Sequence, residues 1–433
     1  MPQRARLVAA SVFVVAAFSF LGYRMYDYHR DRPREPQVAE DPIVLQARAL
    51  YVRGSRSEAL ALLSRAHRED PQNHDVALEY VSVLYTTQNY EAAEGAASDA
   101  LAADPTFTRM LGLRGMIRRD GGKLEQGIAD LEAAVAADPD EAVFVYSLAS
   151  ALLLRSSREL GLTAAAQADI DRAAQLLQRA AELEPLNPEI LSDLAFVQTR
   201  RSQWLAAIEV YRRLAKMLPQ EAGPLASAAE CYLESGDAAR AAAMARAAVE
   251  RDPQYAPGHE QLARALRKLP AESVDADEYK QALRSWWDQS RAATSVPALW
   301  LAEAHIREEN LEAAEAVLRE SLADEEERRH PPDPEAHDLL ARVLRDSARE
   351  EEAELELAVA RRLHDQWDPA GDLISRITAR PEQSRGDRLK LARLYQELGW
   401  PDLGLPYLKP MLNADPPDAE AEELARELRD ATP

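Results

Sequence analysis

Few side chains in this 433-residue sequence have the types and spacing that chemistry requires. Cys231 is the single cysteine, so the chain can form neither an internal disulfide nor a zinc site that needs two thiolates. The eight histidines are scattered, and none lies three or four positions from another, the spacing that puts two ligands on one helix face. No base for Cys231 is identifiable, which favours a buried thiol over a nucleophile. We predict no metal site and no catalytic residue.

The Gly121–Lys123 stretch lacks the spacing of a phosphate-binding loop. Acidic runs such as Glu350–Glu352 are interleaved with arginines, which is typical of solvated helix faces. The sequence therefore predicts no cofactor and no enzyme. One alternative is the regulatory or accessory half of an enzyme system, with an unrecognised site near residues 270–295 or 366–384.

The composition is that of an acidic, folded protein. Lysine and arginine number 52 against 74 aspartates and glutamates, which gives a formal net charge of −22. Nucleic-acid binding requires a basic surface, so this charge argues against it. Hydrophobic residues make up 46% of the chain, which excludes a wholly disordered one. The acidic surface favours partner proteins with basic segments.

Residues 7–23 form an apolar run without charge. At about 1.5 Å per residue, a helix here would be about 25 Å long, near the short limit for crossing a bilayer. No small-x-small cleavage site follows, so we interpret the run as an uncleaved transmembrane anchor that contacts the lipid bilayer. A cleaved signal peptide and a buried helix are the alternatives. Residues 1–6 form a short tail before the anchor, and residues 24–40 form a polar linker after it.

The charges that flank the run give opposing signals about orientation. Arg4 and Arg6 favour a cytoplasmic N-terminus, whereas Arg24, Arg30 and further arginines just beyond the run oppose it. We expect the short basic tail to decide. This interpretation places the anchor in the inner (cytoplasmic) membrane of a bacterium and the C-terminal body in the periplasm.

Proline recurs along the remaining chain with a constant period. Two sets of three share the same spacing, and the gap between the sets is longer than one period. Proline disfavours helix at the residue before it, so each position predicts a helix end. The prolines are Pro71, Pro105 and Pro139 in the first set and Pro185, Pro219 and Pro253 in the second.

Small and apolar residues keep the phase of the prolines. The positions twelve, eight and five before each proline hold such side chains, as at Ala59, Leu63 and Ala66. Offsets of four and three put each trio on one helical face. A second stripe lies further upstream, as at Leu262 and Leu266. Small residues in these stripes let two antiparallel helices approach closely, so each period predicts a helical hairpin.

The pattern over residues 41–268 resembles the tetratricopeptide repeat, a family with two helices in each repeat of about 34 residues and a proline near the end of the repeat. The resemblance implies an all-α fold, a right-handed superhelical solenoid of helix hairpins whose first helices line a concave groove. One hairpin cannot bury its apolar face alone, so neighbouring hairpins must stack.

The long gap between Pro139 and Pro185 places an insert in this first repeat block, at 155–170. Residues Ser156 to Glu159 fit a capping box, so we expect the insert to lengthen the second helix of its hairpin. A protrusion that contacts a partner is the alternative.

The phase breaks at residues 269–294, a divergent helical connection that carries Trp286 and Trp287. We expect these tryptophans to pack in the core or between repeats, with an exposed partner anchor as the alternative. A second, degenerate block of repeats follows at residues 295–433, for a total of about nine repeats. The charged segment 418–430 is the expected capping helix.

The resemblance also maps a partner-binding groove onto the first helix of each hairpin. The lysine/asparagine clamp with which chaperone-binding members hold a C-terminal carboxylate does not occur at the mapped positions. The surface mixes aromatic, acidic and basic side chains, which suits an extended peptide or a helix better than a small molecule. The alternative is that these side chains only fill the inner face. The groove residues are Tyr85, Met116, Arg119, Tyr146, Phe196, Arg200, Glu230, Arg264 and Arg267, with Thr199, Glu234, Glu260 and Lys268 among their neighbours.

These observations predict a membrane-anchored scaffold or adaptor that mediates protein–protein interaction in the assembly of a membrane or envelope complex. The anchor would supply a high local concentration, so each groove contact can be weak. A structural protein that self-assembles by stacking solenoid ends is a further alternative, against which the charged final helix argues.

Overall fold

The computed structural model describes residues 41–158, 163–290, 295–328, 333–380, 383–412 and 417–431. Within these ranges every regular element is a helix and no strand occurs, which confirms the all-α class. The predicted tail, anchor and linker (residues 1–40) lie outside the described ranges. Among the described helices, none combines the length and apolar character needed to span a membrane.

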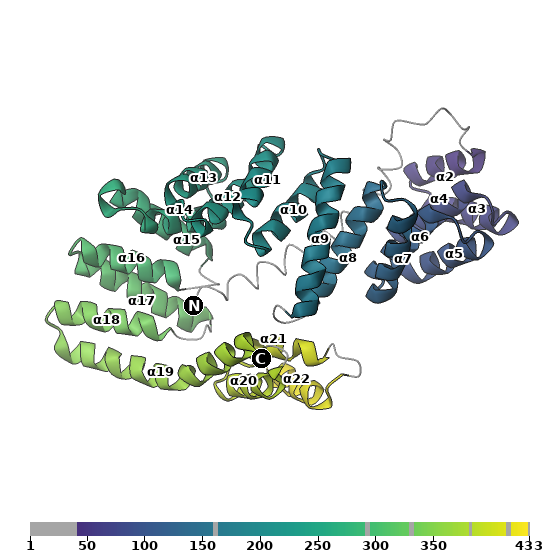
Figure 1. The fold of residues 1–433 in the computed structure, drawn as a ribbon. Helices are drawn as coiled ribbons and strands as arrows, with labels where there is room; N and C mark the ends of the chain where they lie inside the picture. Colours follow the sequence, from purple (N-terminus) through teal and green to yellow (C-terminus); the bar gives the residue numbers. More distant parts are fainter. Residues whose placement is uncertain are drawn as a thin grey trace. The chain divides into compact units, whose positions relative to one another are not determined.

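The described residues fold into ten successive helix pairs and a final single helix (Figure 1). We call the first helix of each pair the A helix and the second the B helix. The A helices are α2 (Pro42–Val52), α4 (His74–Thr86), α6 (Thr108–Asp120), α8 (Ala142–Arg158), α10 (Pro188–Arg200), α12 (Gly223–Glu234), α14 (Ala256–Lys268), α16 (Val296–Arg307), α18 (Pro334–Asp346) and α20 (Arg385–Glu397). The B helices are α3 (Arg56–Glu69), α5 (Tyr90–Ala103), α7 (Leu124–Ala137), α9 (Ala164–Leu183), α11 (Trp204–Met217), α13 (Ala238–Arg251), α15 (Ala276–Ser290), α17 (Leu311–Arg328), α19 (Glu350–Ala379) and α21 (Pro401–Leu412), and α22 (Ala419–Ala431) ends the series.

All six periodic prolines lie in the short turns between a B helix and the next A helix, as the period predicts. The residue before the proline leaves the helical region, with φ of −141° at Asp70 and −139° at Asp104. The Asp104 carboxylate then accepts a hydrogen bond from the backbone N–H of Thr106, 2.9 Å away. Aspartate before proline therefore ends one helix and stabilises the turn into the next.

In eight of the ten described pairs, the turn from the A helix to its B helix uses one residue with positive φ. Glycine adopts this conformation without steric cost, and other residue types adopt it where the turn demands it. These residues are Gly54, Gln88, Gly122, Ser202, Gly236, Glu309, Ala348 and Gly399.

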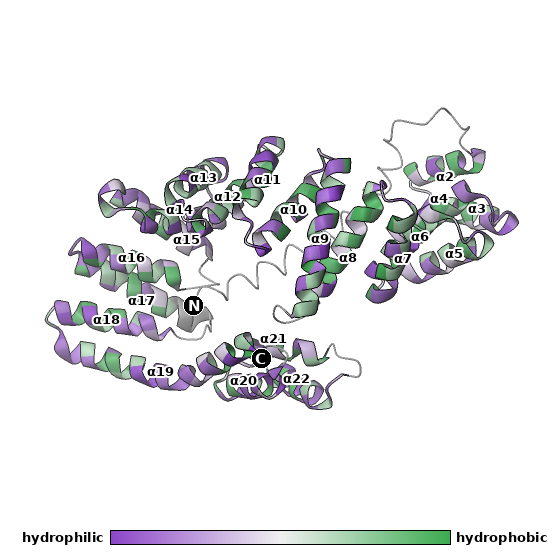
Figure 2. Ribbon diagram, viewed as in Figure 1, coloured by the Kyte–Doolittle hydropathy of each residue, from purple (hydrophilic) through white to green (hydrophobic). Residues whose placement is uncertain are grey.

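Small residues allow the two helices of a pair to approach each other closely. In α7, a Cβ added at Gly127 would lie 2.7 Å from the carbonyl oxygen of Gly115 in α6. The alanines at the equivalent position of other B helices, such as Ala59 and Ala93, have no exposed surface. Figure 2 shows that apolar and polar residues alternate along the described helices. The predicted hairpin interface is therefore present.

Helix pairing continues through residues 269–290. After a turn of 3-10 helix at Ala271–Ser273, α15 packs against both α14 and α16. Trp286 and Trp287 are both buried, with 6% and 2% of their surface exposed. The Trp286 ring meets the Trp300 ring edge-on, with centroids 5.7 Å apart. The tryptophans are thus core residues, and the alternative of an exposed anchor is wrong.

The insert at 155–170 lengthens both helices of its pair. Helix α8 has 17 residues and α9 has 20, against 13 and 14 in α6 and α7. The predicted capping box at Ser156 is wrong, because Ser156 lies inside α8 and donates a hydrogen bond to the Leu153 carbonyl oxygen. The side chain of Thr163 caps α9 instead, accepting from the backbone N–H of Ala166 at 3.0 Å.

The chain divides into two compact units. One consists of the described residues of Met1–Ser156 and Ala168–Ile190, and the other of those of Ser157–Gln167 and Leu191–Pro433. The predicted division into two repeat blocks joined at 269–294 remains a prediction.

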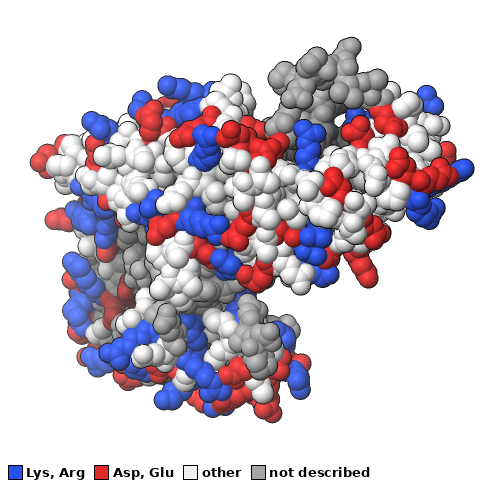
Figure 3. Space-filling view, turned by 45° about the vertical axis from the view of Figure 1, so that its right-hand side comes forward, with Lys and Arg blue, Asp and Glu red and all other residues white. Residues whose placement is uncertain are grey.

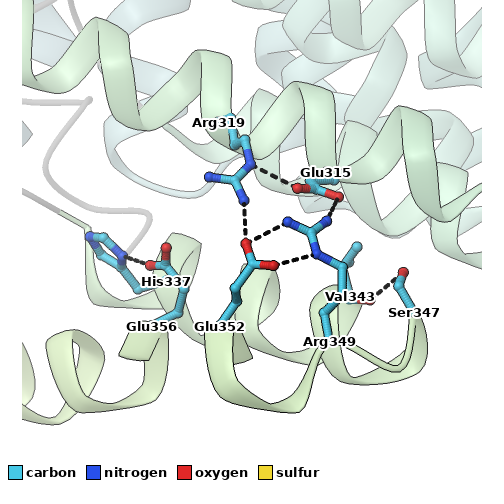
Figure 4. A network of polar contacts seen from close by, with 8 residues as sticks. All are labelled: Glu315, Arg319, His337, Val343, Ser347, Arg349, Glu352 and Glu356. Carbon is cyan, nitrogen blue, oxygen red and sulfur yellow. Dashed lines mark hydrogen bonds and ion pairs between the residues drawn. The ribbon is translucent and has the colours of Figure 1, made fainter. Parts of the chain in front are cut away.

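Ion pairs join residues about one period apart. Arg48 of α2 pairs with Glu79 of α4 at 2.8 Å, and Arg349 pairs with Glu315 of α17 at 2.7 Å. Figure 4 shows that Arg349 also binds Glu352 at the start of α19. Arginine–carboxylate pairs therefore link neighbouring repeats at more than one position of the repeat.

Helix α19 has 30 residues and contains Pro369. Its N-terminal half packs against α18, while its C-terminal half contributes Ala370 and Leu373 to a core shared with α20. Helix α22 then buries Leu424 and Leu428 against α20 and α21 and leaves its charged residues outward. The predicted capping segment therefore folds as a helix with one apolar face.

The thiol of Cys231 in α12 is fully buried. It lies 3.5 Å from the hydroxyl of Thr199. Burial raises the pKa of this thiol to about 11, although the contact with Thr199 acts in the opposite direction. The thiol is therefore a protonated core group at neutral pH, as the sequence predicts.

We expect Gly127→Ala to destabilise the first unit. The new methyl group would lie 2.7 Å and 2.8 Å from backbone atoms of Gly115 and Arg119, so α6 and α7 must separate. Overpacking of this kind costs about 1–3 kcal/mol of unfolding free energy. The matched control is Gly95→Ala in α5, where a Cβ meets nothing within 4 Å and alanine should gain about 0.5–1 kcal/mol. Urea unfolding followed by circular dichroism compares them, and equal midpoints would contradict the close approach.

We expect Cys231 to make stability depend on alkaline pH. Its folded pKa lies above the unfolded value of about 8.5, so the stability it contributes is complete below that pH and is lost as pH rises towards about 11. A rise of this size corresponds to about 3 kcal/mol. The difference in unfolding free energy between the native chain and Cys231→Ala should therefore shrink between about pH 8.5 and 11. A pH-independent difference would show that the thiol does not titrate there.

Candidate partner-binding face

Every predicted groove residue lies on an A helix, and we call this set of residues, which includes buried and exposed side chains, the A-helix face. The first unit holds four of them and the second unit holds five. They are Tyr85 on α4, Met116 and Arg119 on α6, and Tyr146 on α8, followed by Phe196 and Arg200 on α10, Glu230 on α12, and Arg264 and Arg267 on α14.

In the first unit, Asp120 brings Tyr85 and Arg119 together. The Arg119 guanidinium binds the Asp120 carboxylate through Nε at 2.7 Å and Nη2 at 3.2 Å. The Tyr85 hydroxyl donates a short hydrogen bond to the same carboxylate. The phenol of Tyr146 lies close enough to raise the pKa of Arg119. Met116 is buried in the helix packing and takes no part in this cluster.

Burial governs the charges of this cluster. Tyr85 is 4% and Arg119 1% exposed. Burial strongly raises the pKa of Tyr85, and the nearby Arg119 charge only partly offsets it. For Arg119, burial lowers the pKa, but Asp120 and Tyr85 raise it above its usual value. The guanidinium stays charged beside a carboxylate, so the cluster is a buried ion pair and offers no proton donor near neutral pH.

Asp120 was not among the predicted groove residues. Its signal in the sequence is its place beside Arg119 at the end of α6, directly after a mapped position. Asp120, in the last turn of its A helix, thus belongs to the A-helix face together with the predicted groove residues.

In the second unit the face begins with an aromatic ring. Phe196 is 38% exposed, which is unusual for a phenylalanine, and the Arg200 guanidinium lies 5.9 Å from its ring centroid. Cation–π contact at this distance is favourable but weak. Glu230 lies half-buried on the next A helix.

Arg264 and Arg267 connect neighbouring A helices through carboxylates. Arg264 lies 3.4 Å from Glu234 of α12 and 3.6 Å from Glu260 of its own helix. Arg267 pairs with Glu303 of α16 at 2.9 Å. The acidic and basic side chains of the predicted groove therefore neutralise each other across the second unit.

Trp300 and Glu303 are further residues of this face that sequence reasoning missed. The Arg267 guanidinium lies 4.2 Å from the Trp300 ring centroid, in addition to its ion pair with Glu303. Glu303 follows Ala302 just as Arg264 follows Ala263, so the small-residue register gives the signal. Trp300 has no such signal, because tryptophan occurs in cores and on binding surfaces alike.

In the described ranges, no three His, Cys, Asp or Glu side chains are placed to hold a metal ion. The A-helix face therefore offers aromatic contacts and paired charges over several helices. Such a surface can bind an extended chain through many small contacts, and hydrogen bonds to it would be made mainly by arginines and carboxylates.

Models of the tetratricopeptide repeat match the sequence from the end of α2 to the start of α12. One matches residues 53–117, and another matches residues 113–157 and 158–222. No curated protein matches the sequence.

Three of the solved structures that resemble parts of this chain have TM-scores below 0.5. The C-terminal part of a TPR repeat-containing protein from Cytophaga hutchinsonii is 12% identical, with a TM-score of 0.45 over 59% of this chain and 97% of that one. The pilF protein of Pseudomonas aeruginosa is 18% identical, with a TM-score of 0.41 over 51% and 95%. YrrB, described as a TPR protein with an unusual peptide-binding site, is 16% identical, with a TM-score of 0.40 over 46% and 96%.

Sequence and geometry agree on the nature of the repeat. Residues 53–222 match it directly, and the described helices have the paired arrangement, proline corners and small-residue contacts that the period requires. Residues 53–222 are therefore tetratricopeptide repeats.

Proposed function

We propose that the protein is a membrane-anchored scaffold that binds partner proteins through its A-helix face during assembly of a membrane or envelope complex. In this proposal the helix pairs form a right-handed superhelix whose A helices line the concave groove. Residues 7–23 cross the inner membrane, and the repeats extend into the periplasm.

The observation that carries the binding proposal is the repeated register of the A-helix face. Phe196, Arg264 and Glu303 each directly follow the small residue at which their A helix meets its B helix. In these three A helices of the second unit, the face therefore presents a side chain at the same register. An extended segment, whose own side chains recur along its length, suits such a series better than a small molecule does.

Surface charge refines the class of partner. Acidic and basic side chains are interspersed over the visible surface (Figure 3). The face of the second unit pairs Glu234 with Arg264 and Glu303 with Arg267, so it can exchange ion pairs with a partner of either sign. The net charge of −22 still favours the approach of basic segments from a distance.

The proposed anchor makes weak contacts sufficient. A scaffold held at the membrane meets other membrane proteins at a high effective concentration, so low affinity per contact still gives stable assembly. The support for the anchor is the apolar run with flanking arginines, Arg4 and Arg6 before it and Arg24 after it.

We expect substitutions of the A-helix face to remove partner binding. Crosslinking in the native membrane followed by affinity capture should recover specific partner proteins with the unmodified chain. Phe196→Ala should weaken capture about tenfold or more, because an exposed aromatic anchor contributes about 2 kcal/mol. Leu355→Ala is the matched control, since Leu355 is 69% exposed on B helix α19, away from this face. Equal loss in both variants, or no specific partner, would refute the proposal.

We expect protease added to intact spheroplasts to digest the repeats if they lie in the periplasm. Complete protection would instead place them in the cytoplasm.

A chain without residues 1–30 should leave the membrane fraction and remain strongly helical by circular dichroism. If this variant still sediments with membranes in a helical state, residues 7–23 are not the anchor.

A further inference from the structure

Helix α2 carries an exposed apolar stripe. Leu45, Ala49 and Val52 are spaced by four and three positions, so they share one face of the helix. All three are exposed, and Leu45 and Val52 have 48% and 77% of their surface accessible. The opposite face of α2 packs Val44 and Ala47 against α3 and α4.

The stripe is exposed because α2 begins the series of described pairs. The residues one, two and three periods after Ala49 are Val83, Ile117 and Ala151, and each has at most 2% of its surface exposed. Helix α3 covers α4 at this position, and α5 covers α6. No described helix precedes α2 to cover Ala49 in the same way.

The charges beside the stripe are basic. Arg53 and Arg56 are exposed, and neither forms an ion pair with a described residue, while Arg56 lies 5.3 Å from the Tyr51 ring centroid. Asp41, the nearest acid on α2, is engaged as its N-cap and by Asn73. Glu58 lies in the first turn of α3, and Glu79 is paired with Arg48 of α2. This end of an acidic protein thus combines apolar and basic side chains.

We propose that the face of α2 formed by Leu45, Ala49 and Val52, with Arg53 and Arg56 beside it, lies on the surface of a bilayer with anionic lipids. The inference rests on the proposed anchor. Residues 24–40 reach at most about 60 Å when extended, and α2 is the first described helix after the proposed anchor along the chain. Apolar side chains enter the boundary between headgroups and acyl chains, and arginines bind the anionic headgroups.

Charge complementarity favours this occupant over a second copy of the chain. In a parallel contact of two copies through the stripe, Arg53 and Arg56 of each copy would lie close to the same arginines of the other, and like charges repel. A bilayer with anionic lipids instead offers the opposite charge along the whole face. Because the anchor already holds the chain at the membrane, the contact needs little affinity of its own.

A spin label at position 52 of the full chain tests the inference. The chain carries Val52→Cys and Cys231→Ala and is reconstituted into vesicles of phosphatidylcholine with phosphatidylglycerol. Collision with oxygen, which enters lipid, is compared with collision with a water-soluble nickel chelate. We expect the label to favour oxygen. The control label at Leu355→Cys, which is also exposed in the described structure, should favour the nickel chelate.

Charge reversal gives the second arm. Arg53→Glu with Arg56→Glu should return the label at position 52 to the accessibility of the control. The same reversal of Arg342 and Arg345 on α18 should leave it unchanged.

Each other outcome overturns the inference. Equal accessibility at positions 52 and 355 would leave α2 in water. Dipolar broadening between labels at position 52 would assign the face to a second copy. A third outcome is protection of the label at position 52 from both oxygen and the nickel chelate. If that protection is the same in pure phosphatidylcholine and after charge reversal, the face of α2 is covered by another segment of the chain. If the chain does not sediment with vesicles at all, the anchor itself fails, whereas sedimentation with a water-exposed label refutes only the position of α2.

Discussion

The close contact between the two helices of each pair is the constraint on which the rest of the structure depends. Where Gly115 and Gly127 meet, a single methyl group does not fit between the helix backbones. Ala59 and Ala93 occupy the same place in other pairs and are fully buried. Since the helices are this close at one point, larger side chains on either side must interlock with the next pair, and the series of repeats follows.

The features predicted from the sequence are those that the period repeats. The proline corners, the small-residue contacts and the helical nature of residues 276–290 were all visible as positions that recur or as an amphipathic pattern. The nine predicted groove residues lie on A helices for the same reason. The residue type at one position is a weak signal of structure. The same type at several recurrent positions is a strong signal, because all of these positions must agree at once.

The features that the sequence did not predict depend on single positions. The serine at 156 has the residue type of a cap, but the backbone at 156 stays helical and Thr163 takes that role. Asp120 and Trp300 join the A-helix face through contacts with Arg119 and Arg267 on the same or neighbouring helices. Such contacts depend on side-chain directions in three dimensions, which spacing along the chain does not encode.

The A-helix face can offer contacts to a partner although it carries little net charge of its own. Its arginines and carboxylates pair between neighbouring helices, as Arg267 does with Glu303. A partner must therefore replace existing ion pairs, and it gains only the difference between its own contacts and those it displaces. Selectivity then depends on how well the partner matches the spacing of the repeats.

The long helix α19 joins two packing environments in one continuous rod. At 30 residues it is about 45 Å long, and its two halves belong to cores with different neighbours. Pro369 lacks a backbone N–H, so the carbonyl of Asp365 loses its helical hydrogen bond and the rod can bend at that point. Because α18 packs against α19 and the second half of α19 shares a core with α20, one continuous helix takes part in both packing environments.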